Sequence, residues 1–229
     1  VDYLMNGRSE AKAPFLKAKC LINSSETRSV ATALSYIENT LLKSFPMLSM
    51  VFTGFGIGAV LSDRTYSVVT AHLELEQNLI LGRITALKET EKNQLYNDFA
   101  LLYSYNPISD NFEKIISMNS DTNSLCAVSE TNIGKRSMPP IESVVIYDDV
   151  TASYVMNWMV AHLTLPSYYV EYEGVPSLFF SVKTGDVVTL TDDKLGLKNK
   201  RCTVEKITYS RGRSIIGLRI WILYKNIAN

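Results

Sequence analysis

The chain has 229 residues, of which 46% are hydrophobic and 20% are charged, a profile typical of a globular protein and not of a disordered one. Its 23 basic and 23 acidic residues give a net charge of zero, so bulk charge does not indicate a polyanionic partner. No uninterrupted apolar run reaches about 18 residues, and no secretory or transit signal is evident, so the sequence predicts no membrane span.

The chain begins with Val1 rather than Met, which indicates a processed product or part of a longer protein. Its three cysteines, Cys20, Cys126 and Cys202, are far apart and form no CxxC pair, so neither a zinc knuckle nor a redox motif is predicted. We interpret all three as small apolar packing residues.

One helix is predicted near the start of the chain. Asn23 and Glu26 have the spacing of a capping box, and Pro46 lies beyond the last residue that fits a helix. Between them, apolar residues recur along one stripe: Val30, Leu34, Ile37 and Leu41. The sequence therefore predicts a helix over residues 23–43.

Short strands separated by polar turns follow this helix. Runs of strand-like composition occupy residues 47–53, 66–70, 78–85, 99–105 and 112–118. The polar segment before the last run, which includes Pro107, predicts a turn. Pro139 and Pro140 favour extended backbone, so residues 134–140 are the expected linker to a second domain.

The second half shows a similar order of elements. A strand is predicted at residues 142–147, and Asp148 or Asp149 then caps a helix over residues 149–163, which ends before Pro166. The apolar stripe of this helix consists of Val155, Trp158, Met159, His162 and Leu163. Further strands are predicted at residues 186–190, 201–209 and 214–224, with clear alternation of apolar and polar residues at 202–207.

These elements predict a mainly β protein with two helices, of the α+β class. We expect two small antiparallel β-barrel-like domains, each with an associated helix. Residues 1–138 form the N-terminal β-rich domain with helix 23–43, and residues 139–229 form the C-terminal β-barrel domain with helix 149–163. Trp158 is expected to be buried against the C-terminal sheet. Its expected neighbours are Phe179, Val187, Leu190, Val204 and Leu218.

Charge is unevenly distributed in the second half. Residues 142–182 hold five acidic residues and no Lys or Arg, whereas residues 183–225 hold ten basic and four acidic residues, a net charge of +6. Such polarity allows an acidic face of one subunit to meet a basic face of the next. Two solvated surfaces on a single barrel are the alternative interpretation.

Two patterns were considered as cofactor or metal sites. Residues 54–59, GFGIGA, match the dinucleotide-binding pattern GxGxxA, which must open a helix. A strand and a turn are expected next instead, so we interpret the glycines as a β-turn or bulge. His72, Glu74 and Glu76 could hold a metal ion if they converged. His162, on the apolar stripe of its helix, is interpreted as a hydrogen-bonded packing residue.

Two acidic pairs and one basic cluster have structural explanations that require no chemistry. Asp148 and Asp149 stand at a helix start, where a carboxylate caps the helix. Asp192 and Asp193 stand in a turn, where Asp bonds its own backbone. The basic cluster consists of Lys194, Lys198, Lys200, Arg201, Lys206, Arg211 and Arg213. No aromatic residue is interleaved between positions 194 and 206, so solvated loops or salt bridges between subunits are the expected use. We therefore predict no catalytic, cofactor-binding or metal-binding residues.

The C-terminal third carries a distinctive order of motifs. Residues 185–192 spell GDVVTLTD, a turn then holds Leu195-Gly196-Leu197, and a basic strand and a hydrophobic strand follow. This order resembles the C-terminal barrel of bacteriophage tail hub and tail-tip (baseplate hub) proteins. The resemblance is clearest over residues 143–221, where the helix leads into a strand at 168–172, and is fainter at 45–64 and 96–118. No extra domain, fibronectin-like module or lytic insert of the larger hubs is evident, so attachment and enzyme activity are not carried over.

The resemblance implies a structural virion protein, a subunit of a tail hub or tip that closes the tail tube, joins it to the tip and aids genome ejection. It implies a homotrimer that contacts the distal tail ring protein, the tape-measure protein and other tail-tip or fibre proteins. DNA would pass through the lumen without specific binding. The implied location is the phage tail of the virion, after synthesis in the bacterial host cytoplasm, and no enzyme activity is implied.

Two alternative functions belong to other classes. The first is a metal-assisted hydrolase that uses His72, Glu74 and Glu76. The second is a nucleic-acid-binding barrel in which neutralising Lys198, Lys200 and Arg201 would weaken a salt-dependent affinity for DNA. These functions would be distinguished by bound metal in the first case and by salt-dependent DNA binding in the second.

Overall fold

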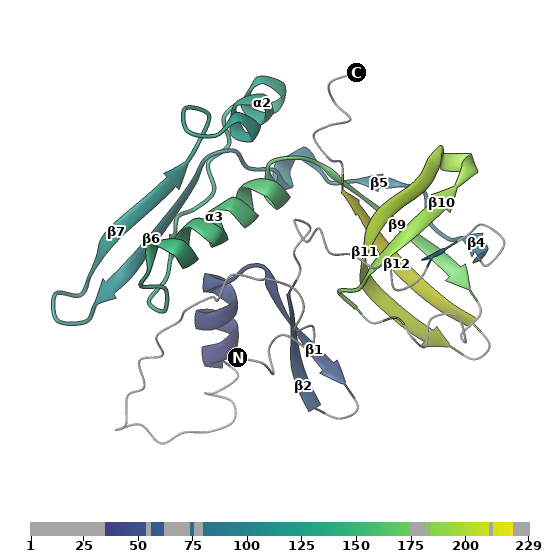
Figure 1. Ribbon diagram of the computed structural model, residues 1–229, viewed down its shortest axis with the longest axis horizontal. Coiled ribbons are helices and arrows are strands. Elements are labelled where there is room, and N and C mark those ends of the chain that lie inside the picture. The colour runs from purple at the N-terminus through teal and green to yellow at the C-terminus, as the bar shows by residue number, and fades with distance from the viewer. Residues whose placement is uncertain are drawn as a thin grey trace. The chain divides into compact units, whose positions relative to one another are not determined.

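The computed structural model describes residues 35–53, 56–61, 74–75, 80–174, 182, 184–210 and 213–221 (Figure 1). These residues belong to two compact units. The first unit contains the described residues of 1–50 and 93–165, and the second contains those of 51–92 and 166–229. The domain boundary expected between residues 138 and 139 therefore differs from this division, since it lies inside the first unit.

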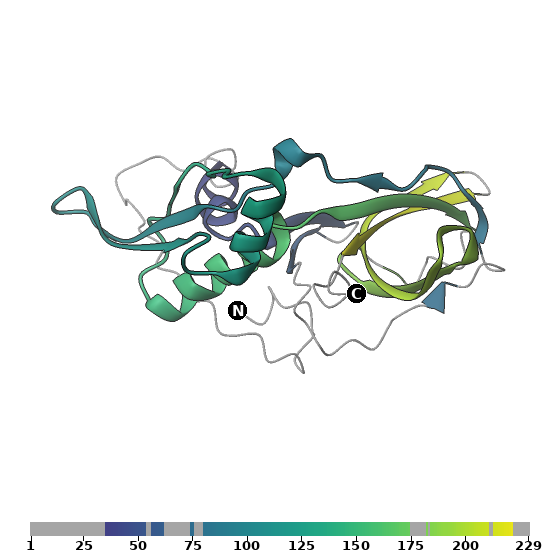
Figure 2. The same cartoon turned by 90° about the horizontal axis from the view of Figure 1, so that it is seen from above.

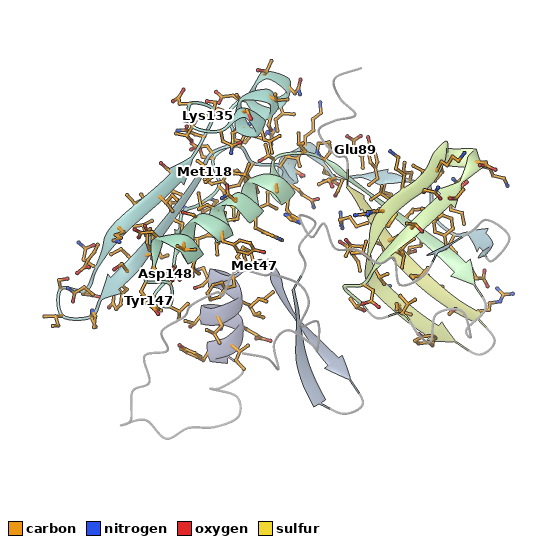
Figure 3. All side chains as sticks on the ribbon, in the orientation of Figure 1. Met47, Glu89, Met118, Lys135, Tyr147 and Asp148 are labelled. Atoms are coloured by element: carbon orange, nitrogen blue, oxygen red, sulfur yellow. The ribbon has the colours of Figure 1, made fainter. Side chains whose placement is uncertain are left out.

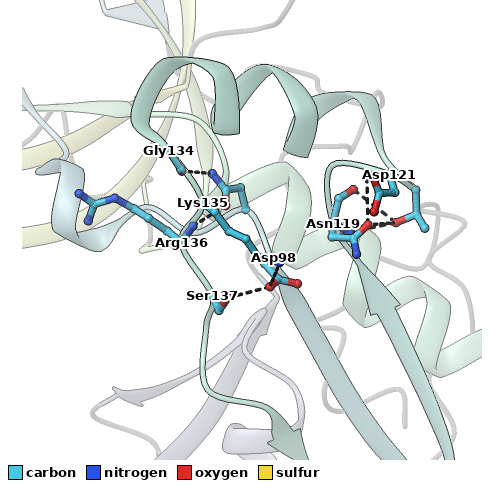
Figure 4. Close-up of polar contacts among 9 residues, drawn as sticks. Asp98, Asn119, Asp121, Gly134, Lys135, Arg136 and Ser137 are labelled. Carbon is cyan, nitrogen blue, oxygen red and sulfur yellow. Dashed lines mark hydrogen bonds and ion pairs between the residues drawn. The ribbon is translucent and has the colours of Figure 1, made fainter.

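Hydrogen bonds hold the expected linker to the first unit (Figure 4). The backbone N–H groups of Asn97 and Asp98 donate to the carbonyl of Arg136 at 2.9 and 3.2 Å, and Met138 N–H donates to the carbonyl of Asp98 at 2.9 Å. Ser137 Oγ donates to the Asp98 carboxylate at 2.7 Å, which lowers the pKa of that carboxyl. This segment is therefore hydrogen-bonded to Asn97 and Asp98 and is not a free linker between two domains.

The fold class is confirmed, because the protein is mainly β with helices and belongs to the α+β class. The described strands form a two-stranded, a three-stranded and a seven-stranded sheet. The largest sheet curls into a half-barrel, which Figure 2 shows from above. Among the described residues, no helix has the length and apolar content needed to cross a membrane.

The first unit contains a three-stranded sheet and two helices. β6 (Phe99–Asn106) pairs antiparallel with β7 (Asn111–Met118) and parallel with the short β8 (Ile141–Glu142). The strands predicted at 99–105 and 112–118, with a turn between them, are thereby confirmed, and they pair as a hairpin. The helices are α2 (Ser124–Ile133) and α3 (Asp149–Leu163), of which α3 contacts β6 and β7.

α2 was not predicted, because the only helix expected in the N-terminal β-rich domain was that over residues 23–43. The residues at the two ends of α2 are typical of helix termini. Asn123 caps the start by accepting a hydrogen bond from the N–H of Leu125 at 2.9 Å, and Gly134 follows the end with a φ of 78°. Only Cys126 and Ser129 of this helix are buried. The apolar stripe is therefore too narrow to predict the helix by periodicity.

The second unit is organised around the seven-stranded sheet in the order β3-β10-β11-β12-β9-β4, and β5 pairs with β9. The strands are β3 (Glu74–Leu75), β4 (Ile80–Arg83), β5 (Lys88–Glu89), β9 (Ser167–Gly174), β10 (Val187–Asp192), β11 (Leu197–Ser210) and β12 (Arg213–Trp221). β10, β11, β12 and β9 pair antiparallel in succession. The order of the C-terminal strands was therefore predicted correctly, while residues 222–224 of the last predicted strand lie outside the described residues.

Alternate residues of these strands form the core of the second unit: Val170, Tyr172, Val182, Val188, Leu190, Cys202, Val204, Ile216, Leu218 and Ile220. The inward positions predicted for Leu190, Val204 and Leu218 are confirmed. The position predicted for Val187 is wrong, because side chains alternate along β10 and Val187 cannot share a face with Leu190. Phe179 lies outside the described residues.

Trp158 does not belong to this core. The buried stripe of α3 consists of Ala152, Val155, Met156, Met159 and Val160, and the helix contacts β6 and β7 of the first unit. Trp158 lies at the edge of that stripe, is only partly buried, and stacks on His162 with ring centroids 4.1 Å apart. The prediction that Trp158 is buried against the C-terminal sheet is therefore wrong.

The structure describes only part of the N-terminal elements that the sequence predicts. Residues 35–44 are helical and include the π-helical η1 (Ile37–Leu42), while the rest of the predicted helix, residues 23–34, lies outside the described residues. The strand predicted at 47–53 is β1 (Leu48–Thr53), which pairs with β2 (Gly56–Leu61). Residues 66–70 are not described.

The strand predicted at 142–147 is corrected to the two residues of β8. The chain turns directly afterwards, because Ser143 Oγ accepts a hydrogen bond from the N–H of Ile146 at 3.1 Å. The carbonyl of Ile146 then accepts from the N–H of Ser104 at 2.9 Å. Two single-turn helices complete the described elements: η2 (Lys92–Gln94) and η3 (Asp193–Leu195).

Candidate functional site

The β6–β7 hairpin has two unlike faces, and α3 covers one of them. On the covered face Phe99, Leu101 and Tyr103 are buried. Tyr103 pairs across the hairpin with Lys114. The Asp149 carboxylate at the start of α3 accepts hydrogen bonds from Lys114 Nζ at 2.7 Å and from Tyr103 Oη at 3.0 Å, and these lower the pKa of Asp149.

Among the described elements, α3 packs on the first face only, and we call the opposite face the open face. Strand alternation and register give its residues as Ala100, Leu102, Glu113, Ile115, Ser117 and Glu142. Leu102 pairs with Ile115 of β7 on one side and with Glu142 of β8 on the other. Ile115 is 65% exposed. The open face therefore presents an aliphatic centre to solvent.

Carboxylates flank this aliphatic centre. The Glu113 carboxylate accepts hydrogen bonds from Asn106 Nδ2 at 2.9 Å and from Ser104 Oγ at 3.4 Å, which hold its position. Glu142 is exposed. The one cation of the three strands, Lys114, belongs to the covered face and is paired with Asp149. Within the described residues of β6, β7 and β8, the open face is thus acidic and has no cation.

Exposed apolar side chains concentrate around the hairpin and the start of α3. The described residues include six large hydrophobic side chains that are exposed, and four of them lie here: Ile108, Ile115, Tyr147 and Val150. Ile108, in the turn between β6 and β7, is 96% exposed. Tyr147 directly precedes the N-cap of α3 (Figure 3).

The second unit exposes unpaired cations in the β10–β11 hairpin. We call Lys194, Lys198, Lys200, Arg201 and Lys206 the basic hairpin. All except the half-buried Lys200 are exposed, and none forms an ion pair within the part of the chain that the structure describes. Arg213 differs, because it pairs with Glu173 at 3.1 Å, and Arg211 lies outside the described residues.

Polar side chains on β9, β11 and β12 form a fully paired network. Arg219 binds both carboxylate oxygens of Glu205 and donates to Ser167 Oγ at 2.9 Å. Its guanidinium lies 5.7 Å from the centre of the Tyr169 ring, and Tyr169 Oη donates to Glu171 at 3.0 Å. Burial, together with the Glu171 carboxylate, raises the pKa of Tyr169 to about 12. These groups therefore stabilise the sheet, and the raised pKa keeps Tyr169 protonated near neutral pH.

The acidic pairs have the structural roles that the sequence predicts. Asp148 is the N-cap of α3 and accepts from the N–H of Thr151 at 3.0 Å. Asp192 caps η3 by accepting from the N–H of Lys194 at 3.0 Å, and its other oxygen accepts from buried Tyr172 Oη at 2.7 Å. The pKa of Tyr172 is strongly raised, first by burial and then by Asp192.

His162 is a packing residue, as predicted. It is buried, and its Nδ1 lies 2.8 Å from the carbonyl of Trp158. Cys126 and Cys202 are buried thiols, which agrees with the packing role predicted for them. Burial raises the pKa of both, to about 12 for Cys202. Cys20 lies outside the described residues.

The glycine-rich pattern does not open a helix, because Gly56–Leu61 is strand β2. A dinucleotide site of this pattern needs a helix at this point, so the dinucleotide-binding interpretation is excluded. Of the three potential metal ligands, only Glu74 is described, in β3, while His72 and Glu76 are not. The described residues contain no group of three or more His, Cys, Asp or Glu side chains suited to a metal ion, but this leaves the His72 hypothesis untested.

Comparisons with known proteins complete these observations. No protein-family model matches the chain, and no curated protein matches it in sequence. Among solved structures, the chain is similar to the prophage tail protein gp18 from Listeria monocytogenes, with a TM-score of 0.43 and 11% identity over 81% of this chain. It is similar to the 43 kDa tail protein of prophage MuSo2 from Shewanella oneidensis, with a TM-score of 0.43 and 14% identity over 86% of this chain.

The chain is also similar to a tail protein from Neisseria meningitidis, with a TM-score of 0.48 and 15% identity over 90% of this chain. The matches cover 52%, 56% and 61% of the Listeria, Shewanella and Neisseria chains, respectively. This chain therefore spans between about half and three fifths of the length of the structures it matches.

Proposed function

We propose that this chain is a structural subunit of a bacteriophage tail, at the hub or tip where the tail tube is closed and joined to the tip. The observation that carries the proposal is the order of elements from α3 to β12. α3 leads into β9, a turn leads into β10, η3 connects β10 to β11, and β12 completes the half-barrel. This is the order that the resemblance to tail hub and tail-tip proteins implies for residues 143–221.

The motif on which that resemblance rests has a clear structural role. Gly185 adopts a φ of 89°, a backbone conformation that other residues rarely adopt. Its N–H donates to the carbonyl of Val204 at 2.7 Å, and the carbonyl of Asp186 accepts from the N–H of Val204 at 2.8 Å. The Gly185-Asp186 turn thereby joins the start of β10 to the middle of β11.

A structural subunit needs surfaces that remain free for its neighbours. The open face has an aliphatic centre with carboxylates beside it, which is the anatomy of a protein interface: an apolar core within a polar rim. The basic hairpin offers the opposite charge. In the proposed role these surfaces hold a tail together, and the protein performs no chemical step.

The partners follow from the same proposal. The subunit would assemble as a homotrimer in the virion tail and contact the distal tail ring protein, the tape-measure protein and other tail-tip or fibre proteins. Phage DNA would pass through the lumen without specific binding, because each phosphate held by a cation adds affinity and would slow genome ejection. Protein carboxylates are therefore the proposed partners of the basic hairpin.

Deletion of the gene tests this function. Cells that carry the phage genome without the gene should release particles with absent or defective tails, as judged by negative-stain electron microscopy. A plasmid copy of the gene should restore normal tails. Normal, infectious particles from the deletion strain would overturn the proposal.

A further inference from the structure

We propose that the open face of one copy of this chain binds the basic hairpin of a second copy, in a head-to-tail contact. The inference names a partner for the tail subunit proposed above and rests on that function. It also assigns the contact to particular residues: Glu113, Ile115 and Glu142 on one side, and Lys198 and Arg201 on the other.

The distribution of charge favours a second copy as the occupant. Residues 93–165 contain eight acidic and three basic residues, a net charge of −5. Residues 166–229 contain ten basic and six acidic residues, a net charge of +4. Each copy therefore carries one acidic and one basic segment, and the acidic segment of one copy can meet the basic segment of the next.

Local pairing shows which charges remain uncompensated. In the second unit, Arg83, Arg213 and Arg219 have carboxylate partners in Asp192, Glu173 and Glu205, respectively. The basic hairpin has none among the described residues. On the open face, the donors to the Glu113 carboxylate among the described residues are neutral, so they position its charge without neutralising it. Both surfaces therefore present fixed charge of one sign to an incoming partner.

The apolar centre of the open face provides a reason for close contact. Leu102 and Ile115 are cross-strand neighbours, and Ile115 is 65% exposed. The aliphatic stems of Lys198 and Arg201 can cover such a surface while their charged ends reach the carboxylates at its rim. Burial of Ile115 would stabilise the contact, and the charges would fix its orientation.

Like charge excludes the symmetric alternative. If two open faces met each other, Glu113 and Glu142 of one copy would meet the same carboxylates of the other, which is destabilising. A contact between unlike surfaces has a head-to-tail geometry, and repeated around an axis it closes into a ring. A ring of subunits is what a tail tube requires.

Sedimentation velocity on the full chain tests the contact. The wild type should self-associate in about 0.01 M salt, where the Debye length is about 30 Å, and dissociate in about 1 M salt, where it is about 3 Å. A chain with Glu113→Lys and Glu142→Lys should associate at least about tenfold more weakly, and so should a chain with Lys198→Glu and Arg201→Glu.

Sedimentation of an equimolar mixture of the two variants is the decisive experiment. Each variant alone brings together like charges, but alternate copies in an equimolar mixture pair a basic open face with an acidic hairpin and an acidic open face with a basic hairpin. Contacts between the two unlike variants should therefore regain the affinity of the wild-type contact, while a closed ring of three copies cannot alternate the variants and keeps one like-charge contact. A chain with Glu38→Lys and Asp121→Lys is the matched control, because it makes the same change in charge at exposed positions of the first unit outside the open face. It should associate like the wild type.

Three results would overturn the inference: a wild type that stays monomeric in low salt, double variants that associate within about twofold of the wild type, or a mixture in which contacts between the unlike variants do not recover. Thermal unfolding of each variant separates loss of contact from loss of fold. These three results test the contact between copies. The proposed function is tested separately, by whether the chain is present in tails. A chain found in tails whose variants associate normally would refute this contact alone.

Discussion

Gly217 on β12 is the position where the structure predicts a penalty for a single added methyl group. A Cβ at this position would lie 2.2 Å from Tyr169 Oη and 2.9 Å from Tyr169 Cζ, far inside van der Waals contact. Tyr169 cannot move freely, because its hydroxyl donates to Glu171 and its ring lies beside the Arg219 guanidinium. Gly217→Ala must therefore displace the ring or bend the strand.

The expected cost follows from two opposing effects. Overpacking of a well-packed site costs about 1–3 kcal/mol. Replacing Gly by Ala inside a strand returns about 0.5–1 kcal/mol, because the unfolded chain loses conformational freedom. Gly217→Ala should thus lower the free energy of unfolding by about 1 kcal/mol, which corresponds to a fall in Tm of about 2–4 °C for a chain of this length.

Urea and thermal denaturation, followed by circular dichroism, measure the effect. Gly82→Ala on β4 is the matched control, because a Cβ there has no atom within 4 Å, and it should leave stability unchanged or raise it slightly. The same Gly217→Ala change in a Tyr169→Leu background should cost little or nothing. An equal loss of stability with and without the tyrosine ring would refute the reasoning.

Three further predictions concern the core and the bound segment at residues 134–138. Asn97→Ala should lower the free energy of unfolding by about 2–3 kcal/mol in urea denaturation, because the fully buried amide donates to the Gly134 carbonyl at 2.8 Å and accepts from the Arg136 N–H at 2.7 Å. Leu218→Ala should lower it by about 2–5 kcal/mol, since the side chain is fully buried in the core of the half-barrel. Ser137→Ala should lower the free energy of unfolding at neutral pH by up to about 1 kcal/mol. The free energy of unfolding of this variant should also depend less on pH, because the Ser137 hydroxyl lowers the pKa of Asp98.

The sign of the pH effect follows from the direction of that shift. The lowered pKa of Asp98 contributes stability that is present above its unfolded pKa of about 4 and is lost as the pH falls through the folded value. The stability difference between wild type and Ser137→Ala should therefore shrink between about pH 5 and pH 2. A difference that stays constant with pH would contradict this assignment. A loss below about 1 kcal/mol for Asn97→Ala or Leu218→Ala would contradict the burial on which those predictions rest.

Strong local signals made much of the fold predictable. An N-cap at Asp148 or Asp149 and a stop at Pro166 predicted the bounds of α3, which the structure reproduces as Asp149–Leu163 with Asp148 as the N-cap. The turn after β6 and the series of C-terminal strands were equally well marked. What the helix packs against was not predictable, because its apolar stripe fits any sheet. Trp158 was therefore placed against the wrong one.

The open face could not be predicted from the sequence. β6 is apolar at consecutive positions from Phe99 to Tyr103, so alternation cannot separate the face that α3 covers from the face that it leaves bare. Ile115 and Ile116 of β7 pose the same problem. The basic hairpin was visible as a cluster of Lys and Arg, but only the structure shows which cations have carboxylate partners.

The central claim, that this chain is a structural component of a phage tail, is tested most directly by quantitative mass spectrometry of purified tails. Particles from cells that carry the gene should contain the chain at a small, fixed number of copies relative to the major tube protein, with three per tail for the proposed homotrimer, and the number should not change on washing in high salt. Complete absence of the chain from intact, infectious particles would contradict the account.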